Sequence, residues 1–303
     1  MRKTLLAAVL AGAFSIPAVT FAADAAPAAA PAAAAPAEPA SPHTIAGNLS
    51  IISDYRFRGI TQTFEKPALQ GGIDYSHSSG IYLGNWNSNV NSGAGFPDGN
   101  LEMDFYGGYK MSLGDFGLDF GAIYYYYPGS EATGLGTGAG SGAVNNKEVY
   151  IGATWKFLSL KYNYSFDDYF SLRGVDSAGA FTGQDTKGSN YWDLSATYDL
   201  GDGWGINGHV GRLTVKNVAN ADYTDWKIGV TKDIGGWVFS AAYVDTNASG
   251  DKGPTGGCFG QSSYQPYCFT NSLSSNGAGG LNVGSKTKDA GNSTVVVSVS
   301  KTF

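Results

Sequence analysis

The chain has 303 residues and a formal net charge of −6 at neutral pH, with 25 acidic residues against 19 basic ones. This acidic balance argues against a nucleic-acid-binding protein. Glycine occurs 44 times, about twice its usual frequency, together with 19 tyrosines, 16 phenylalanines and 6 tryptophans. After the N-terminal segment no apolar run reaches the ~18 residues of a membrane-spanning helix, so the composition favours an all-β protein.

Residues 1–22 have the features of a secretory signal peptide. Arg2 and Lys3 precede the apolar stretch Leu5–Phe14, and a small-residue cleavage site ends at Ala22. We expect export through the Sec pathway with cleavage after Ala22, which also removes the two positive charges. The alternative, a retained membrane helix, is disfavoured because the apolar stretch is short.

Residues 23–44 form an Ala/Pro-rich segment of low complexity. Such a segment buries little apolar surface and is typical of a flexible or extended tether. We expect a plain periplasmic linker, with contact to the cell wall as the alternative. The remaining chain, residues 45–303, is expected to form one domain.

That domain contains about twelve segments of roughly nine to thirteen residues in which apolar and polar side chains alternate. In the clearest segment, Leu158, Leu160 and Tyr162 share one face and the polar residues between them share the other. We predict strands over residues 47–58, 68–77, 80–90, 101–111, 117–127, 148–157, 158–166, 191–200, 204–216, 223–233, 236–246 and 292–303.

The connections between these strands alternate between short and long. The short ones read HSSG, SLGDFG, KFLS, LGDGW and DIGGW, whereas long ones include residues 128–147 and 168–190. A transmembrane β-barrel has this pattern, with short periplasmic turns and long extracellular loops. We therefore predict a closed antiparallel barrel of about twelve strands in the bacterial outer membrane, with both termini in the periplasm.

Aromatic residues stand near both ends of the predicted strands, as expected for the two membrane interfaces. The alternative is that these rings form the core of a soluble sandwich, but the opposite faces of the strands are too polar to be buried. The chain also ends on Phe303, a feature by which the barrel-assembly machinery recognises outer-membrane proteins. The predicted interface residues are Phe116, Phe157, Trp204, Trp237 and Phe303 beside the short turns, and Tyr127, Tyr191 and Tyr223 near the long loops.

Three runs carry a resemblance to a known bacterial family. They are SDYRFRGITQT (53–63), KPALQGGIDYSHSSGIYLGNW (66–86) and LEMDFYGGYK (101–110). These runs resemble the Gcw_chp family, also called TorF-family porins, most strongly over about residues 45–110 and more weakly to the C-terminus. The resemblance implies an outer-membrane barrel and carries no settled function or substrate.

In a barrel the polar face of each strand is expected to face the lumen. The segment SDYRFRG would then be the outer half of the first strand, with Tyr55 and Phe57 facing lipid. Charges of both signs inside could select solutes by charge, or could pair with one another and plug the pore. The candidate pore-lining residues are Asp54, Arg56, Arg58, Asp74, Glu102, Asp104, Lys110, Asp119, Glu148, Lys156, Lys161, Asp193 and Lys227.

The two cysteines, Cys258 and Cys268, lie in the last long loop, and in an exported protein we expect a disulfide between them. Two cysteines without a neighbouring histidine are too few ligands for a metal site. The histidines are His43 in the tether, His77 in a predicted turn and His209 in a predicted strand. None belongs to a recognisable nucleophile motif, so we predict no catalytic residues.

The sequence favours a passive outer-membrane channel for small polar or charged solutes, without a cofactor. The alternative is a closed barrel with a role in surface interaction or envelope structure, and a barrel enzyme that depends on His209 is a third hypothesis. The expected partners are outer-membrane lipid, the barrel-assembly machinery and small solutes. The sequence leaves the solute and the oligomeric state open.

Overall fold

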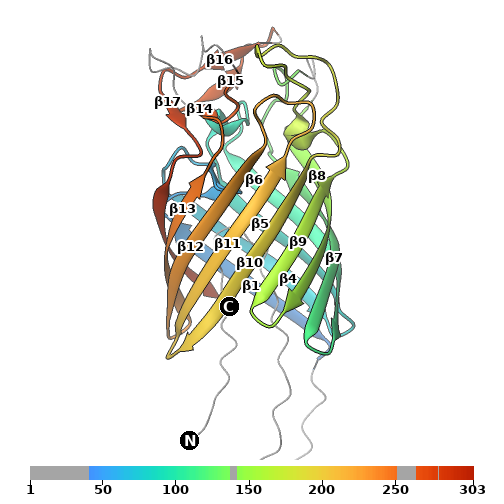
Figure 1. Cartoon of the computed structure of the whole chain (residues 1–303), viewed down its shortest axis with the longest axis vertical. Coiled ribbons are helices and arrows are strands. Elements are labelled where there is room, and N and C mark those ends of the chain that lie inside the picture. The colour runs from blue at the N-terminus through green and yellow to red at the C-terminus, as the bar shows by residue number, and fades with distance from the viewer. Residues whose placement is uncertain (1–40, 137–141, 251–263, 279) are drawn as a thin grey trace, which may run out of the picture.

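The computed structural model describes residues 41–136, 142–250, 264–278 and 280–303. Its long strands form one closed antiparallel barrel, in which the last strand pairs with the first (Figure 1). The barrel strands are β1 (His43–Ile52), β4 (Ala68–His77), β5 (Ile81–Asn89), β6 (Leu101–Leu113), β7 (Phe116–Tyr126), β8 (Asn145–Trp155), β9 (Leu158–Ser165), β10 (Asn190–Gly201), β11 (Trp204–Thr214), β12 (Tyr223–Ile234), β13 (Trp237–Thr246) and β18 (Thr294–Thr302). The all-β barrel architecture with about twelve strands is confirmed.

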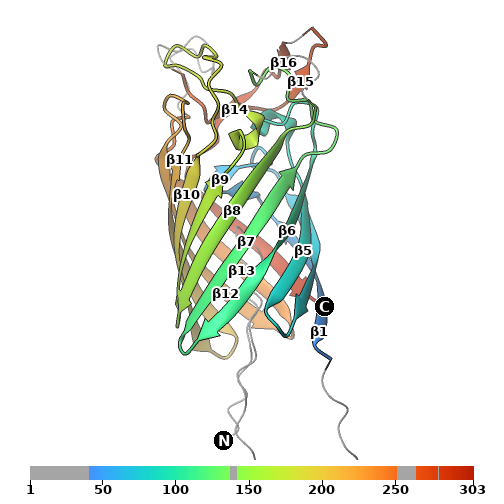
Figure 2. The same cartoon turned by 90° about the vertical axis from the view of Figure 1, so that its right-hand side faces the viewer.

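The two ends of the barrel differ. At one end, which we call the turn end, neighbouring strands are joined by residues 78–80, 114–115, 156–157, 202–203 and 235–236. At the other, the loop end, the connections are longer, and several of them rise above the barrel rim (Figure 2). These connections hold β2 (Arg56–Phe57), β3 (Ile60–Thr61), η1 (Ser92–Ala94), η2 (Tyr169–Ser171), β14 (Cys268–Thr270), β15 (Leu273–Ser275), β16 (Leu281–Val283) and β17 (Thr287–Asp289).

The outer face of the barrel is apolar because side chains alternate between the two faces of each strand. Ile73, Ile228 and Val295 each expose more than 60% of their surface. Exposed aromatic rings stand near both ends: Phe116, Trp155, Tyr198, Trp204 and Trp237 near the turn end, and Trp192, Trp226 and Tyr243 near the loop end. Among the described residues, no helix is long and apolar enough to cross a membrane.

The predicted aromatic belt at the loop end was assigned to the wrong residues. Tyr127, Tyr191 and Tyr223 are buried, each less than 5% exposed. The register explains the error for Tyr191, because its neighbour Trp192 faces outward and adjacent strand residues face opposite sides. The first strand also begins earlier than predicted, since β1 starts at His43 and not at residue 47.

Glycines on the inner face allow tyrosine rings to lie flat against the barrel wall. Three such pairs lie on neighbouring strands: Tyr82 over Gly108, Tyr106 over Gly84 and Tyr150 over Gly121. A Cβ atom at Gly108 would meet the hydroxyl of Tyr82 at 2.5 Å, so any larger residue there would displace the ring. The high glycine content therefore has a packing role inside the barrel.

Candidate functional site

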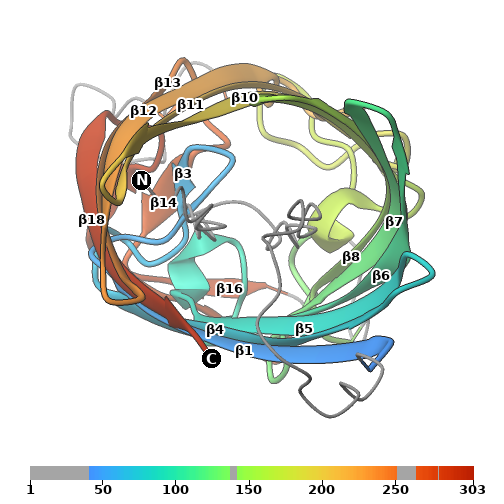
Figure 3. The ribbon, with the colours of Figure 1, turned by 90° about the horizontal axis from the view of Figure 1, so that it is seen from below.

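The connection between β1 and β4 folds back into the barrel as a small hairpin, β2–β3, which we call the lumen hairpin (residues 54–64). Seen from the turn end, it lies inside the ring of strands (Figure 3). Its two turn residues, Arg58 and Gly59, have φ angles of 50° and 80°, as a two-residue turn with matching twist requires. A side chain at Gly59 would also meet the Cβ of Asp225 at 2.7 Å, so glycine fits this close approach.

The lumen hairpin corrects the predicted course of SDYRFRG. Strand β1 ends at Ile52, so Tyr55 and Phe57 do not face lipid. Tyr55 is 4% exposed and its hydroxyl donates to Glu102 Oε1 at 3.1 Å, while Phe57 contacts the ring of Tyr125 edge-on at 5.6 Å between centroids. The segment does alternate polar and aromatic residues, but it packs on both faces within the lumen.

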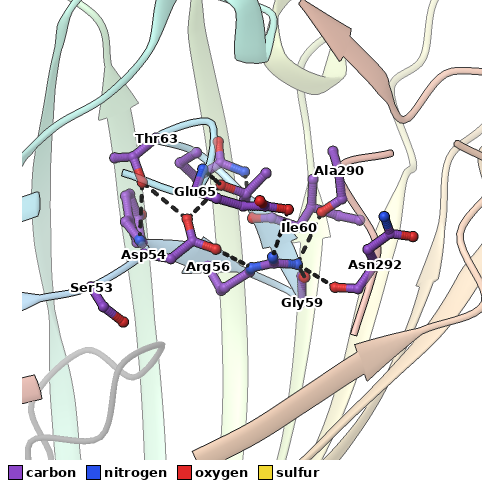
Figure 4. A network of polar contacts seen from close by, with 12 residues as sticks. Ser53, Asp54, Arg56, Gly59, Ile60, Thr63, Glu65, Ala290 and Asn292 are labelled. Carbon is purple, nitrogen blue, oxygen red and sulfur yellow. Dashed lines mark hydrogen bonds and ion pairs between the residues drawn. The ribbon is translucent and has the colours of Figure 1, made fainter. Parts of the chain in front are cut away.

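Arg56 fastens the hairpin to the far end of the chain (Figure 4). Its side chain is fully buried, and Nε donates to Asp54 Oδ2 at 2.5 Å. Its Nη1 donates to the main-chain carbonyls of Gly59, Ala290 and Asn292 at 2.9–3.1 Å. The last two carbonyls immediately precede β18, so this arginine joins the first loop to the approach of the last strand.

Asp54 is the other centre of this network. Its Oδ1 accepts hydrogen bonds from the hydroxyls of Thr61 at 2.5 Å and Thr63 at 3.0 Å. The carboxylate is thus held by two hydroxyls and by Arg56, which offsets the cost of burying it.

Arg58, at the tip of the hairpin, reaches across the lumen to β8. Its Nη2 donates to both oxygens of Glu148, at 3.0 and 2.7 Å, and Nη1 donates to the hydroxyl of Tyr169 at 3.2 Å. The guanidinium also lies over the rings of Phe57 and Tyr191, 4.7 and 4.5 Å from their centroids. Arg58 and Glu148 are 6% and 1% exposed, so water screens this ion pair little.

Buried phenols in the connecting loops surround the hairpin. Burial, followed by the charges of Glu102 and Asp104, raises the pKa of Tyr55 well above its ordinary value. Burial raises the pKa of Tyr169 to about 12, although the positive charge of Arg58 opposes that change. Burial likewise holds the pKa of Tyr267 well above its ordinary value. These tyrosines are therefore neutral hydrogen-bonding groups at neutral pH.

Most other candidate lumen residues lie on the inner wall: Asp74 on β4; Glu102, Asp104 and Lys110 on β6; Asp119 on β7; Glu148 on β8; Lys161 on β9; Asp193 on β10; and Lys227 on β12. Lys156 was misplaced, because it lies in the 156–157 turn with its ammonium 4.9 Å from the ring centroid of the outward-facing Trp155.

Lys110 and Lys161 lie close to tyrosines on the wall. Their ammonium groups stand over the rings of Tyr82 and Tyr150, 4.7 and 3.7 Å from the centroids. The nearby carboxylate of Asp119 accepts a hydrogen bond from the Tyr82 hydroxyl at 2.7 Å. Within the described part of the chain, neither lysine has a carboxylate within 4 Å. Both ammonium groups can therefore meet groups that enter the lumen.

His209 lies on β11, two strands from Lys161, between two aspartates, an arrangement that the sequence did not indicate. Its Nδ1 is 3.1 Å from Asp193 and its Nε2 is 2.7 Å from Asp225. Ser195 Oγ is 3.4 Å from Nδ1, but it donates to Asp193 at 2.5 Å. Both ring nitrogens thus face carboxylates, whereas a general base needs one nitrogen free to accept the serine proton.

These four residues come from three strands that pair side by side, with Ser195 opposite His209. Only the strand register brings them together, so no local motif could have revealed them. In the described residues, no group of three or more histidine, cysteine, aspartate or glutamate side chains is arranged to hold a metal ion. Cys268 begins β14, whereas Cys258 lies outside the described residues, so their disulfide stays a prediction.

Comparisons with known proteins identify a matching family model and several solved structures of similar fold. A family model described as "Bacterial protein of unknown function (Gcw_chp)" matches residues 36–262, and the TorF porin name stays a prediction. The comparison with curated proteins found no match.

Several solved structures are similar. For the NanC porin the identity is 10% and the TM-score 0.46, covering 86% of this chain and 99% of that one. The P. putida toluene transporter TodX is 10% identical with a TM-score of 0.40, and the match covers 88% of this chain and 91% of that one. An anion-selective porin from Comamonas acidovorans is 13% identical with a TM-score of 0.33, and the match covers 86% of this chain and 99% of that one.

Proposed function

The chain belongs to the Gcw_chp family of bacterial proteins, and we propose that this member is an outer-membrane channel through which small polar or charged solutes diffuse passively. The observation that carries this proposal is the closed barrel, apolar outside and charged inside. A closed sheet satisfies its backbone hydrogen bonds internally, as a hydrocarbon surrounding requires. The exposed aromatic rings near both ends match the two interfaces of a bilayer.

In this proposal the turn end faces the periplasm and the loop end faces the outside. A cleaved Sec signal over residues 1–22 would deliver the chain, and the part of the predicted tether that precedes β1, residues 23–42, would remain in the periplasm. The exposed C-terminal Phe303 is our candidate contact for the barrel-assembly machinery. Transport would be diffusive and would need no cofactor.

The charges on the inner wall would set the selectivity of such a channel. Acidic side chains outnumber basic ones there: Asp74, Glu102, Asp104, Asp119, Glu148, Asp193 and Asp225 against Lys110, Lys161 and Lys227. The lumen hairpin adds Arg56 and Arg58 against Asp54, which reduces the acidic excess without removing it. A lumen lined by excess negative charge concentrates cations. We therefore expect a cation-preferring conductance, with Lys110 and Lys161 as the groups that moderate this preference.

Planar-bilayer recording of refolded protein tests this proposal through the reversal potential in a salt gradient. The variant Lys110→Gln/Lys161→Gln should prefer cations more strongly than the wild type, because it removes two positive charges from the lumen. Lys156→Gln is the matched control, since Lys156 lies in a turn outside the lumen, and it should leave the reversal potential unchanged. A wild-type conductance no greater than that of the empty membrane would count against a channel.

A second candidate function is a closed barrel with a role at the cell surface or in envelope structure. The burial of the lumen hairpin favours it, because Arg56 is fully buried and Arg58 is tied to the opposite wall. A variant in which a short glycine–serine link replaces residues 54–64 distinguishes the two. If only this variant admits sugars in liposome swelling, the wild-type barrel is closed; if both admit them, the hairpin only narrows the pore.

A further inference from the structure

One barrel strand presents polar side chains on the outside. On β5, Tyr82, Trp86 and Ser88 face inward, so that Asn85 and Asn87 face outward with Asn89. We call these three residues the asparagine stripe. Asn85 is the fifth of nine residues in β5, and the stripe continues from there to the loop end.

The neighbours of the stripe belong to the apolar exterior. Asn85 lies opposite Ile73 of β4 on one side and Phe105 of β6 on the other, and these are 62% and 44% exposed. Asn87 lies opposite Gly71, which has no side chain to cover the amide. The middle of the stripe therefore lies at the depth that the bilayer would cover, if the barrel spans the outer membrane as proposed above.

The hydrogen bonds made within the chain satisfy these amides only in part. Asn85 Nδ2 donates to the carbonyl of Asp104 at 2.9 Å, and Asn87 Nδ2 donates to Asn85 Oδ1 at 2.6 Å and to the carbonyl of Gly71 at 3.4 Å. Asn89 accepts from the main-chain N–H of Leu69 at 2.7 Å and donates to the carbonyl of Pro67 at 3.4 Å, so the unsatisfied groups belong to Asn85 and Asn87. Among the described residues no donor reaches Asn87 Oδ1, and Asn85 has a second amide hydrogen without an acceptor. An unpaired amide group in hydrocarbon is costly, and polar side chains at such positions commonly bond a neighbouring protein.

The other strands show that the stripe is unique on the described exterior. On every other barrel strand the outward residues of the middle part are aliphatic, aromatic, alanine or glycine. A ring of three or more copies needs two different complementary patches on each copy, whereas a two-fold axis joins one patch to itself. Amides suit self-pairing because each both donates and accepts.

We propose that the asparagine stripe is the contact between two copies of this chain, related by a two-fold axis parallel to the barrel axis. Among two-fold axes, only one in this direction keeps both barrels in the same orientation in the membrane and sets like residues at the same depth. The free oxygen of Asn87 and the free amide hydrogen of Asn85 then find partners on the second copy. Gly71 allows the two walls to approach at this point. The acyl chains of lipid offer neither a donor nor an acceptor.

Cross-linking in isolated outer membranes tests the contact. In a Cys258→Ser/Cys268→Ser background, Asn89→Cys treated with a short bismaleimide should give a covalent dimer. Asn190→Cys is the matched control, because Asn190 is also an asparagine at the loop end of a strand, on the opposite side of the barrel. It should give at least tenfold less dimer.

The native mass of the purified protein in mild detergent provides a second measurement. The wild type should have the mass of two chains, and Asn85→Leu/Asn87→Leu the mass of one. Heat-modifiable migration on gels verifies that each variant has formed its barrel and therefore separates loss of contact from loss of folding. A folded wild type that is monomeric in membranes, with equal cross-linking at residues 89 and 190, would overturn the proposal.

Discussion

The ion pair between Arg58 and Glu148 should decide whether the lumen hairpin stays in place. We consider Glu148→Gln, which keeps the size of the side chain and its ability to accept from Asn146 Nδ2, now 3.0 Å away. It removes the negative charge and leaves the guanidinium of Arg58 buried against aromatic rings. The hydroxyl of Tyr169, which also accepts from Arg58, is neutral and cannot compensate the positive charge of the guanidinium as a carboxylate does.

The burial of this pair sets the size of the effect. Both side chains are at most 5% exposed, and both carboxylate oxygens accept from one nitrogen of the guanidinium. Removing one partner of a buried pair costs about 3–5 kcal/mol, because the other charge is left uncompensated. At the lower bound this increases the population of the released hairpin roughly a hundredfold.

Hydrogen exchange of the folded protein measures this release directly. The amides of Thr61 and Gln62 donate to the carbonyls of Ala290 and Tyr55 at 3.0 and 2.7 Å, so they exchange only when the hairpin opens. Exchange in the peptide 53–67 should accelerate roughly a hundredfold. The exchange rates of peptides from β12 and β13 should not change.

Two further variants make the result interpretable. Asp167→Asn breaks an ion pair with Lys147 that is 40–47% exposed, and it should cost less than about 1 kcal/mol. Arg58→Met/Glu148→Gln removes both charges, and it should recover most of the lost protection. An acceleration in Glu148→Gln no larger than in Asp167→Asn would refute the view that Arg58 and Glu148 hold the hairpin.

Three other outcomes follow from the structure. The pKa of Tyr169 is about 12 in the folded protein and about 10 in the unfolded chain. The neutral phenol therefore contributes its full share to the free energy of unfolding below pH ~10, and this contribution is lost as the pH rises through 12. Absorbance titration at tyrosinate wavelengths should show a late-titrating group that is absent in Tyr169→Phe; identical curves would disprove this. Gly108→Val should lower the free energy of unfolding in urea by about 1–3 kcal/mol, because its side chain meets the Tyr82 ring. Gly47→Val is the control, since a Cβ there comes no nearer than 3.9 Å to another atom and its φ is not positive; an equal loss in both variants would contradict this reasoning. Mass spectrometry without reductant should find a peptide joining Cys258 to Cys268, and free thiols at both would contradict that prediction.

The barrel could be predicted from the sequence because its signals are local. Alternation of apolar and polar residues, as in Leu158–Ser165, and the contrast between short and long connections are both visible in one chain. The lumen hairpin could not, since its contacts join residues far apart, such as Arg58 with Glu148 and Arg56 with Ala290. The hairpin is itself extended, so its alternation was mistaken for the continuation of β1.

Strand β5 shows a second limit of the pattern. The rule that polar residues face the lumen would put its asparagines inside, yet Trp86 faces inward and meets the ring of Tyr55 at 5.4 Å between centroids. The alternation of β5 thus fixes the period, while the hairpin that fills the lumen fixes which face is inside. The identities of Trp86 and Asn85 alone do not show which face of β5 is turned to the lumen.

The bonds from Arg56 to the carbonyls before β18 also constrain the order in which the protein can be assembled. Residues 54–64 are synthesised early, but the carbonyls of Ala290 and Asn292 arrive with the last strand. Until β18 pairs with β1, the guanidinium lacks these acceptors and Asp54 is its main partner. Docking of the first loop is therefore a late step, and its protection from proteases in newly made protein reports that the ring of strands has closed.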